Sequence, residues 1–237
     1  MKTIRIAHLY YDLMNLYGEN GNVLALRENF ISQGVSCEVE KLTIGDEINL
    51  SKYDIVYIGS GSEFNENIVA QDIIKYKADF KNAINNNKFI ICTGNSIELF
   101  GNYIERINDS IIDCLGIFDF YAKEVHQRIM GEQLVECDFL KEPLIGFQNR
   151  QCIMNNKENY LFSVINGHAE NYKTKYEGIH YKNFIATYII GPILIRNPQL
   201  TDYIVKTVLD KKNIGFIPNT NTLDYKAYNE YIKNFIS

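Results

Sequence analysis

The sequence lacks the features that mark membrane, secreted and nucleic-acid-binding proteins. Its 237 residues include no run of 18 apolar residues, which excludes a membrane-spanning helix. The first residues form neither the apolar core nor the small-residue cleavage site of a signal peptide. The net charge is −5, from 24 basic and 29 acidic side chains, and the lysines form no stripe for a phosphate backbone. We therefore expect a cytoplasmic chain that binds no nucleic acid.

Clustered metal ligands and disulfide patterns are also missing. The five cysteines are odd in number and include no C-x-x-C pair, which disfavours a disulfide framework and a thiolate zinc site. The four histidines are dispersed and show no ligand spacing. We expect reduced thiols, no metal and no cofactor. These residues are Cys37, Cys92, Cys114, Cys137, Cys152, His8, His126, His168 and His180.

The first ninety residues alternate between short apolar runs and helical patterns. Hydrophobic residues make up 46% of the chain, enough for one domain over residues 1–237. Strands alternating with helices predict an α/β fold with a mostly parallel sheet and helices on both faces. The expected strands are 4–10, 35–42, 54–59 and 89–92, and the expected helices follow the stripes Val23–Phe30 and Val69–Ile84.

The pattern changes after Gly101. Between residues 111 and 190 the apolar runs look extended, so this part is expected to add strands to the sheet edge or to form a β-rich layer. Helical spacing returns at 200–208 and at 225–235.

The stretch from Lys88 to Gly101 carries the strongest chemical signal. An apolar strand ends at Cys92, Gly94 follows, and a helix is expected at once. This order is typical of a nucleophile elbow, in which a sharp strand-to-helix turn presents a reactive side chain to helix N–H groups. Those groups lower a thiol pKa and can bind an oxyanion, here with a contribution from Thr93. The competing interpretation is a structural cysteine packed at the end of a strand.

A glycine-rich loop follows the third expected strand. Gly59, Ser60 and Gly61 come directly after the run DIVYI. In an open α/β sheet, ligands bind beyond the carboxyl ends of the strands, so these backbone amides could supply a second oxyanion donor. A plain flexible turn is the alternative for this loop taken alone.

Five segments, in order along nearly the whole chain, resemble the GatD-type subunits in the cobyric-acid-synthase-like branch of class I glutamine amidotransferases. Each motif is weak alone, but the ordered set is specific. They are NLYGENGN at 15–22 with Leu26-Arg27, GSGS at 59–62, CTGNS at 92–96, LGIFDFY at 115–121 with Arg128, and EGIHYKN at 177–183 followed by TYIIGP at 187–192.

The resemblance implies a flavodoxin-like class I amidotransferase fold and a two-subunit enzyme. In that family the amidotransferase subunit hydrolyses glutamine, and ammonia passes to a MurT-like Mur ligase that uses ATP. The ligase amidates D-glutamate in the membrane-borne peptidoglycan precursor lipid II. By this resemblance Cys92 would be the nucleophile, and Arg128 would hold the α-carboxylate of glutamine, with a solvated arginine as the alternative.

One position departs from the family pattern in a way that bears on catalysis. The family histidine lies in a Thr-Tyr-x-His-Gly-Pro run, and here Ile190 takes its place between Tyr188 and Gly191. An isoleucine can neither accept the thiol proton nor protonate ammonia. Losing the base of an acyl-transfer site typically lowers the rate by at least about 10⁴-fold. His180, ten residues earlier, is expected to be a surface or packing residue.

Three hypotheses follow from these residues. The chain is an active amidotransferase subunit that uses another base, or a catalytically degenerate binding and scaffolding subunit. The third is a cysteine hydrolase on a related scaffold, against which the missing histidine counts equally. Glu63 and Glu98 lie on or near the two loops, but there is no base for them to orient.

Overall fold

A six-stranded, mostly parallel sheet forms the centre of the molecule. The structure is a computed structural model and describes residues 3–236. The strand order is β11-β12-β4-β3-β1-β2, and every neighbouring pair is parallel except β11 and β12. The strands are β1 (Thr3–Leu9), β2 (Ser36–Leu42), β3 (Ile55–Ile58), β4 (Phe89–Thr93), β11 (Ile179–Tyr181) and β12 (Phe184–Thr187).

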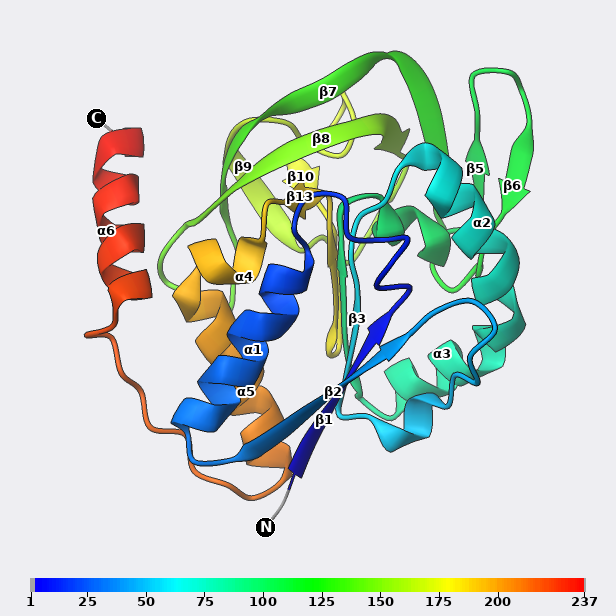
Figure 1. The fold of residues 1–237 in the computed structure, drawn as a ribbon. Helices are drawn as coiled ribbons and strands as arrows, with labels where there is room; N and C mark the ends of the chain where they lie inside the picture. The colour runs from blue at the N-terminus through cyan, green and yellow to red at the C-terminus, as the bar shows by residue number, and fades with distance from the viewer. Residues whose placement is uncertain (1–2, 237) are drawn as a thin grey trace.

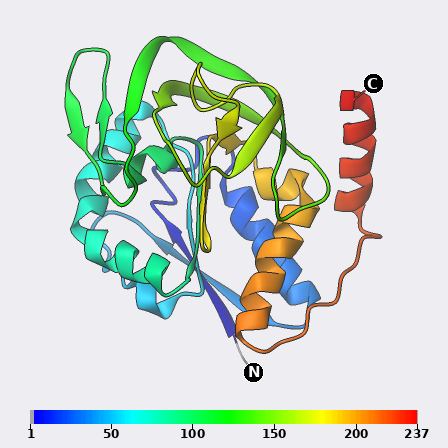
Figure 2. The same cartoon turned by 180° about the vertical axis from the view of Figure 1, so that it is seen from behind.

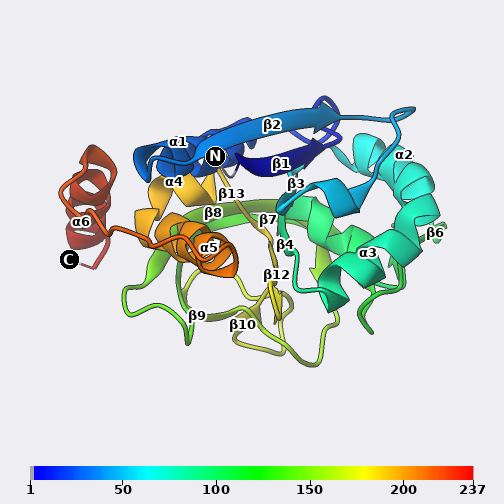
Figure 3. The same ribbon diagram turned by 90° about the horizontal axis from the view of Figure 1, so that it is seen from below.

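Helices cover both faces of this sheet, as Figure 1 shows with the sheet seen nearly edge-on. The buried side chains of α1 and α5 pack on one face with those of β1 and β3, and α2 and α3 pack on the other face. The view from below shows the same two layers (Figure 3). The α-helices are α1 (Asn20–Ser32), α2 (Glu63–Ile73), α3 (Lys77–Asn85), α4 (Ile193–Arg196), α5 (Pro198–Lys211) and α6 (Leu223–Ile236).

A second sheet arches over the carboxyl ends of the central strands (Figures 1 and 2). It is mostly antiparallel, and its longest strands pair over most of their length. Its short strand β13 directly follows β12, so one continuous segment links the two sheets. Its strands are β5 (Tyr103–Glu105), β6 (Ile111–Asp113), β7 (Ala122–Glu136), β8 (Leu144–Met154), β9 (Phe162–Asn166), β10 (Tyr176–Glu177) and β13 (Ile189–Ile190).

The α/β expectation is confirmed, with two local differences. The stripe from Val69 to Ile84 is interrupted by a 3₁₀ turn, η2 (Ile74–Tyr76), so it forms two helices instead of one. The segment after β4 is also a 3₁₀ helix, η3 (Gly94–Phe100). A short 3₁₀ helix, η1 (Leu50–Lys52), precedes β3. For residues 111–190 the sequence left two arrangements open, added edge strands or a β-rich layer. The structure contains both, since β11 and β12 extend the central sheet and the other strands of this region form a second layer.

The helices of the described chain are short or amphipathic. None of those within residues 3–236 has the length and hydropathy to cross a membrane.

Candidate functional site

Cys92 lies inside β4 and not at the turn that follows it. It pairs with Ile58 of β3 and Ala186 of β12, and its side chain is completely buried in the apolar core on the α2–α3 face. Burial raises the pKa of the Cys92 thiol well above its usual value, and a hydrogen bond with Ser96 offsets this only in part. The thiol is therefore protonated at neutral pH and shielded from solvent.

The sharp change of chain direction occurs two residues later, at Gly94. Its φ of +63° lies in the left-handed region, where a side chain is strained. A Cβ placed on residue 94 would lie 2.2 Å from Ser60 Oγ and 2.9 Å from Ile190 Cγ2. Residue 94 therefore points into the space between the glycine loop and the segment that carries Ile190.

Ile190 is brought to the turn by the link between the two sheets. It belongs to β13, pairs with Phe147 of β8, and is 2% exposed. A Cβ on residue 94 would lie 2.9 Å from its Cγ2. The side chain of Ile190 thus faces Gly94, and it is a hydrocarbon.

The glycine loop after β3 passes very close to the chain that follows β1. A Cβ on Gly59 would lie 2.3 Å from the carbonyl oxygen of Met14, and one on Gly61 would lie 2.7 Å from that of Leu13. Glycine is required at both positions for this approach. The loop is therefore rigidly placed against residues 13–14, which argues against a plain flexible turn.

The donors of the glycine loop point at Asn95. The Gly61 N–H donates to Asn95 Oδ1 over 2.9 Å, and the Ser60 hydroxyl donates to the same oxygen over 3.1 Å. These are the directions from which an oxyanion would be stabilised. The Gly61 N–H and the Ser60 hydroxyl thus both have a partner within the chain.

Thr93 and Glu19 lie on the α1–α5 side of the turn. The Thr93 hydroxyl donates to the buried carboxylate of Glu19, which also accepts from Tyr57 Oη at 2.7 Å and Asn22 Nδ2 at 3.2 Å. The Gly191 N–H reaches the other carboxylate oxygen at 3.3 Å. Burial raises the pKa of Glu19, and the hydrogen bonds pull it back. Glu19 therefore joins three distant segments directly beside the turn.

The sequence interpretation assigned no role to Glu19 or to Asn95. Glu19 belongs to the NLYGENGN segment, in which an acidic residue close to Gly21 and Asn22 gives no signal of burial. Asn95 directly follows the sharp turn, where asparagine is common for conformational reasons alone.

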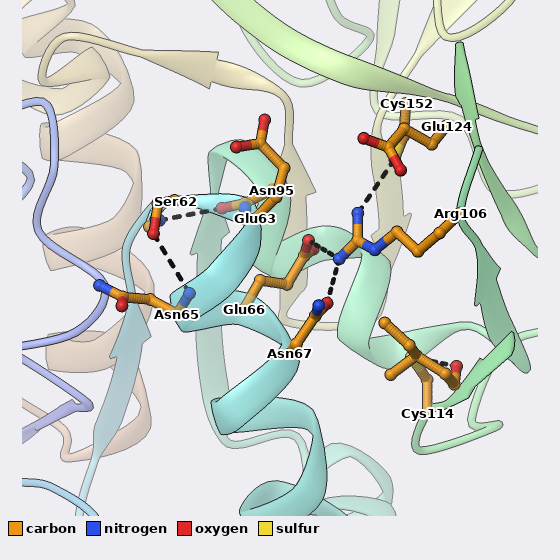
Figure 4. A network of polar contacts seen from close by, with 12 residues as sticks. Ser62, Glu63, Asn65, Glu66, Asn67, Asn95, Arg106, Cys114, Glu124 and Cys152 are labelled. Carbon is orange, nitrogen blue, oxygen red and sulfur yellow. Dashed lines mark hydrogen bonds and ion pairs between the residues drawn. The ribbon is translucent and has the colours of Figure 1, made fainter. Parts of the chain in front are cut away.

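Arg128 lies on β7, at the entrance to this region. Its guanidinium contacts Glu63 Oε1 at 2.6 Å and Asn149 Oδ1 at 3.2 Å. Both members of the ion pair are about one-third exposed. Figure 4 shows Glu63 at the start of α2, close to Asn95. The structure therefore brings Arg128 to the same region as Ser60 and Gly61.

A small cavity separates these groups. Its volume is about 20 Å³, which is room for roughly one water molecule. Cys92 and Ile190 are not among the residues that line it. The lining residues include Tyr17, Ser60, Gly61, Glu63, Glu66, Asn95, Glu98, Arg128 and Asn149.

The sequence matches the CobB/CobQ-like glutamine amidotransferase domain over residues 5–198. It is 32% identical over 212 residues to the lipid II isoglutaminyl synthase (glutamine-hydrolyzing) subunit GatD of Streptococcus pneumoniae, covering 88% of this chain and 82% of that protein. The same subunit of Staphylococcus aureus is 31% identical over 220 residues, covering 92% and 89%. The chain belongs to the CobB/CobQ-like glutamine amidotransferase family.

Solved structures of glutamine amidotransferases share this family member's fold at low sequence identity. One from Thermotoga maritima aligns with a TM-score of 0.55 at 11% identity, covering 100% of this chain and 97% of that one. The glutaminase domain of Trypanosoma brucei CTPS, with acivicin bound, gives a TM-score of 0.54 at 12% identity over 93% and 98% of the two chains. These likenesses support the class I amidotransferase fold.

The histidines of this amidotransferase domain lie in other contacts. His180 is on the edge strand β11, where its ring packs 4.8 Å from that of Phe139 and burial lowers its pKa. His168 Nε2 lies 3.2 Å from the carbonyl oxygen of Met130, and His126 is exposed on β7. His8 is buried, and its ring packs against that of Tyr57. Burial lowers the pKa of His8 to about 4.

Two of the acidic side chains that line the cavity, Glu66 and Glu98, are buried. Glu66 pairs with Arg106 at 2.7 Å, as Figure 4 shows, and both side chains are almost fully buried. Burial raises the pKa of both Glu66 and Glu98. The negative charge of Glu98 raises the pKa of Glu66 further. Among the residues from 3 to 236, no three acidic, histidine or cysteine side chains are grouped to hold a metal ion.

Proposed function

We propose that this chain is the amidotransferase-like subunit of a two-subunit ligase that amidates lipid II, and that it acts by binding its partner rather than by hydrolysing glutamine. The partner would be a MurT-like Mur ligase that uses ATP, and the pair would act on its membrane-borne substrate from the cytoplasm. The GatD subunits of Streptococcus pneumoniae and Staphylococcus aureus match 88% and 92% of the chain in sequence. This similarity supports the proposed role more strongly than a shared fold would.

The turn at Gly94 carries the second half of the proposal. In a nucleophile elbow the reacting side chain belongs to the strained residue at the strand-to-helix turn. Here that residue is glycine, with φ of +63°, and its Cβ position faces Ser60 and Ile190. We infer that residue 94 takes the place of the nucleophile. The two reacting positions then hold a glycine and an isoleucine, which can neither attack a carbonyl carbon nor transfer a proton.

In this account Cys92 is a core residue. It lies two residues before the turn, is paired on both sides in β4, and packs in the same apolar cluster as Ile58 and Ile90. For its sulfur to reach a substrate, β4 would have to leave its pairing with β3 or β12. Catalysis by Cys92 with another base therefore needs a different arrangement of the central sheet.

The test is to assay the chain together with its Mur-ligase-like partner. We expect no glutamate release from glutamine by the complex, and amidation of lipid II when ammonium is supplied. Amidation should fall when this chain is omitted, because the ligase would lose its binding subunit. Glutamine-dependent glutamate release that disappears in Cys92→Ser would refute the proposal and support the active-subunit hypothesis.

Ile190→His is the matched control for the position of the base. It restores an imidazole facing residue 94 but supplies no nucleophile there. We expect this variant to remain without glutaminase activity. Activity gained by this single substitution would show that Cys92, and not residue 94, holds the reacting position.

A further inference from the structure

Two side chains of this protein lie against the groups that would receive the two ends of a glutamine molecule. Glutamine offers a side-chain carboxamide and an α-carboxylate. The natural receptors for these groups are a pair of backbone or hydroxyl donors and a guanidinium. In this chain both kinds of receptor are present and both are occupied.

The carboxamide receptor is filled by Asn95. Its Oδ1 accepts from the Gly61 N–H at 2.9 Å and from the Ser60 hydroxyl at 3.1 Å. A substrate carboxamide would place its own oxygen at these donors to have its carbon attacked from residue 94. The side chain of asparagine ends in the same carboxamide as that of glutamine and is one methylene shorter. Asn95 directly follows Gly94 in the chain.

The carboxylate receptor is filled by Glu63. Its Oε1 lies 2.6 Å from Arg128 Nη2, and the neighbouring Nη1 donates to Asn149. A free α-carboxylate would have to displace Glu63 or share the guanidinium with it, against the repulsion between two negative groups. Glu66 and Glu98 line the same cavity and add further acidic groups.

The remaining space excludes a ligand of this size. The cavity measures about 20 Å³, whereas small-molecule pockets usually measure about 300–1,000 Å³. Binding glutamine therefore requires both Asn95 and Glu63 to move away.

We infer that Asn95 and Glu63 act together as an internal glutamine mimic, which closes the former substrate site of this subunit to free glutamine. Both groups are tethered beside their receptors, so they are present at an effective concentration that a dissolved amino acid must overcome. The inference rests on the proposed function and adds to it. The subunit would lack substrate binding as well as the reacting groups.

The experiment is to measure glutamine binding by isothermal titration calorimetry to the purified full chain and to the double variant Asn95→Gly/Glu63→Ala. We expect the wild type to bind at least about tenfold more weakly than the double variant. The binding gained should disappear when Arg128→Ala is added, because the freed guanidinium is its anchor. Equal binding by the wild type and the double variant would overturn the inference.

A matched control removes the same side chains from another region. Asn102 donates to Asp119 and Glu105 pairs with Lys123, both away from the cavity. The variant Asn102→Gly/Glu105→Ala should bind glutamine no better than the wild type. If it gains the same binding, general loosening of the chain explains the effect and the inference fails.

A measurement on the wild type covers the case in which the double variant does not fold. Asn95 Oδ1 accepts from Gly61 and Ser60 in the closed site, so the side-chain amide resonances of Asn95 should not move when glutamine is added. Resonances that shift as glutamine is titrated would overturn the inference. Glutamine that binds to the wild type without being hydrolysed would leave the proposed function intact, so the two failures are distinguishable.

Discussion

Two regions that touch each other at the turn after β4 differ sharply in their chemistry. On one side, Glu19 is buried and accepts hydrogen bonds from three other segments, so both of its carboxylate oxygens have donors. On the other side, the Cβ position of Gly94 lies 2.9 Å from Cγ2 of Ile190, and neither residue carries a polar side chain. This difference supports our proposal that the chain keeps the framework of an amidotransferase site while its reacting positions carry no reactive group.

The largest effect is expected from breaking the framework. Glu19→Ala would remove the shared acceptor of the Thr93 and Tyr57 hydroxyls and the Asn22 amide inside the protein, and it would leave the Gly191 N–H without its acceptor. We expect the free energy of unfolding to fall by about 3–5 kcal/mol. Urea unfolding followed by circular dichroism measures this. Glu230→Ala, which removes an exposed partner of Lys233, should change stability by less than about 1 kcal/mol. Similar losses in the two variants would contradict the role given to Glu19.

The next effect probes the crowded side. Gly94→Ala introduces a Cβ at positive φ that would lie 2.4 Å from Ser60 Cβ. Strain and overpacking together should cost about 2–4 kcal/mol in thermal or urea unfolding. Adding Ser60→Gly should recover part of this loss, because it removes the closest contact. A double variant no more stable than Gly94→Ala alone would show that the clash lies elsewhere.

A pH series tests two other buried carboxyl groups, Glu170 and Glu177. Burial, followed by the charge of Glu177, raises the pKa of Glu170 to about 9, and burial raises that of Glu177 to about 7. Each folded pKa lies above its unfolded value, so the folded state holds protons that the unfolded state releases. Stability should fall by about 1 kcal/mol or more as the pH rises from about 5 to about 9.

Glu170→Gln tests the source of that slope. The amide cannot lose a proton, so the decline between pH 7 and pH 9 should become flatter in chemical denaturation curves. An unchanged slope would exclude Glu170 as its cause.

The smallest effect is expected at Cys92. Cys92→Ala removes a buried sulfur from the core, so stability should fall by about 1–2 kcal/mol. Ammonium-dependent amidation by the complex should not change, because this thiol takes part in no chemical step. Loss of amidation in a variant that remains folded would contradict the account.

The sequence was sufficient for the central sheet and insufficient for the turn. The four runs from Ile4 to Cys92 matched β1–β4 within a few residues, because alternating strands and helices bury apolar residues in a regular pattern. The flanking residues Tyr188 and Gly191 matched Ile190 to the family histidine, and its place beside Gly94 came from the structure. The second sheet was anticipated only as a β-rich region, since pairing between distant strands leaves little local signal.

The reacting position itself could not be placed from sequence. A cysteine at the end of an apolar strand and a glycine two residues later fit an elbow centred on either residue. The backbone angle of Gly94 and the burial of Cys92 are the observations behind our proposal for residue 94, and both depend on tertiary packing. The hydrogen bonds from Ser60 and Gly61 to Asn95 could not be predicted from the sequence either, because their partners lie 35 and 34 residues apart in the chain.

Covalent capture tests the central claim most directly. The purified chain, alone and with its ligase partner, would be incubated with the glutamine analogue 6-diazo-5-oxo-norleucine and examined by intact mass and peptide mapping, with Cys92→Ser as the control. The account predicts no adduct on Cys92 in either state, because the thiol is buried, is protonated and lies below the turn. A specific adduct on Cys92 that is absent from Cys92→Ser would show a working nucleophile and contradict the account.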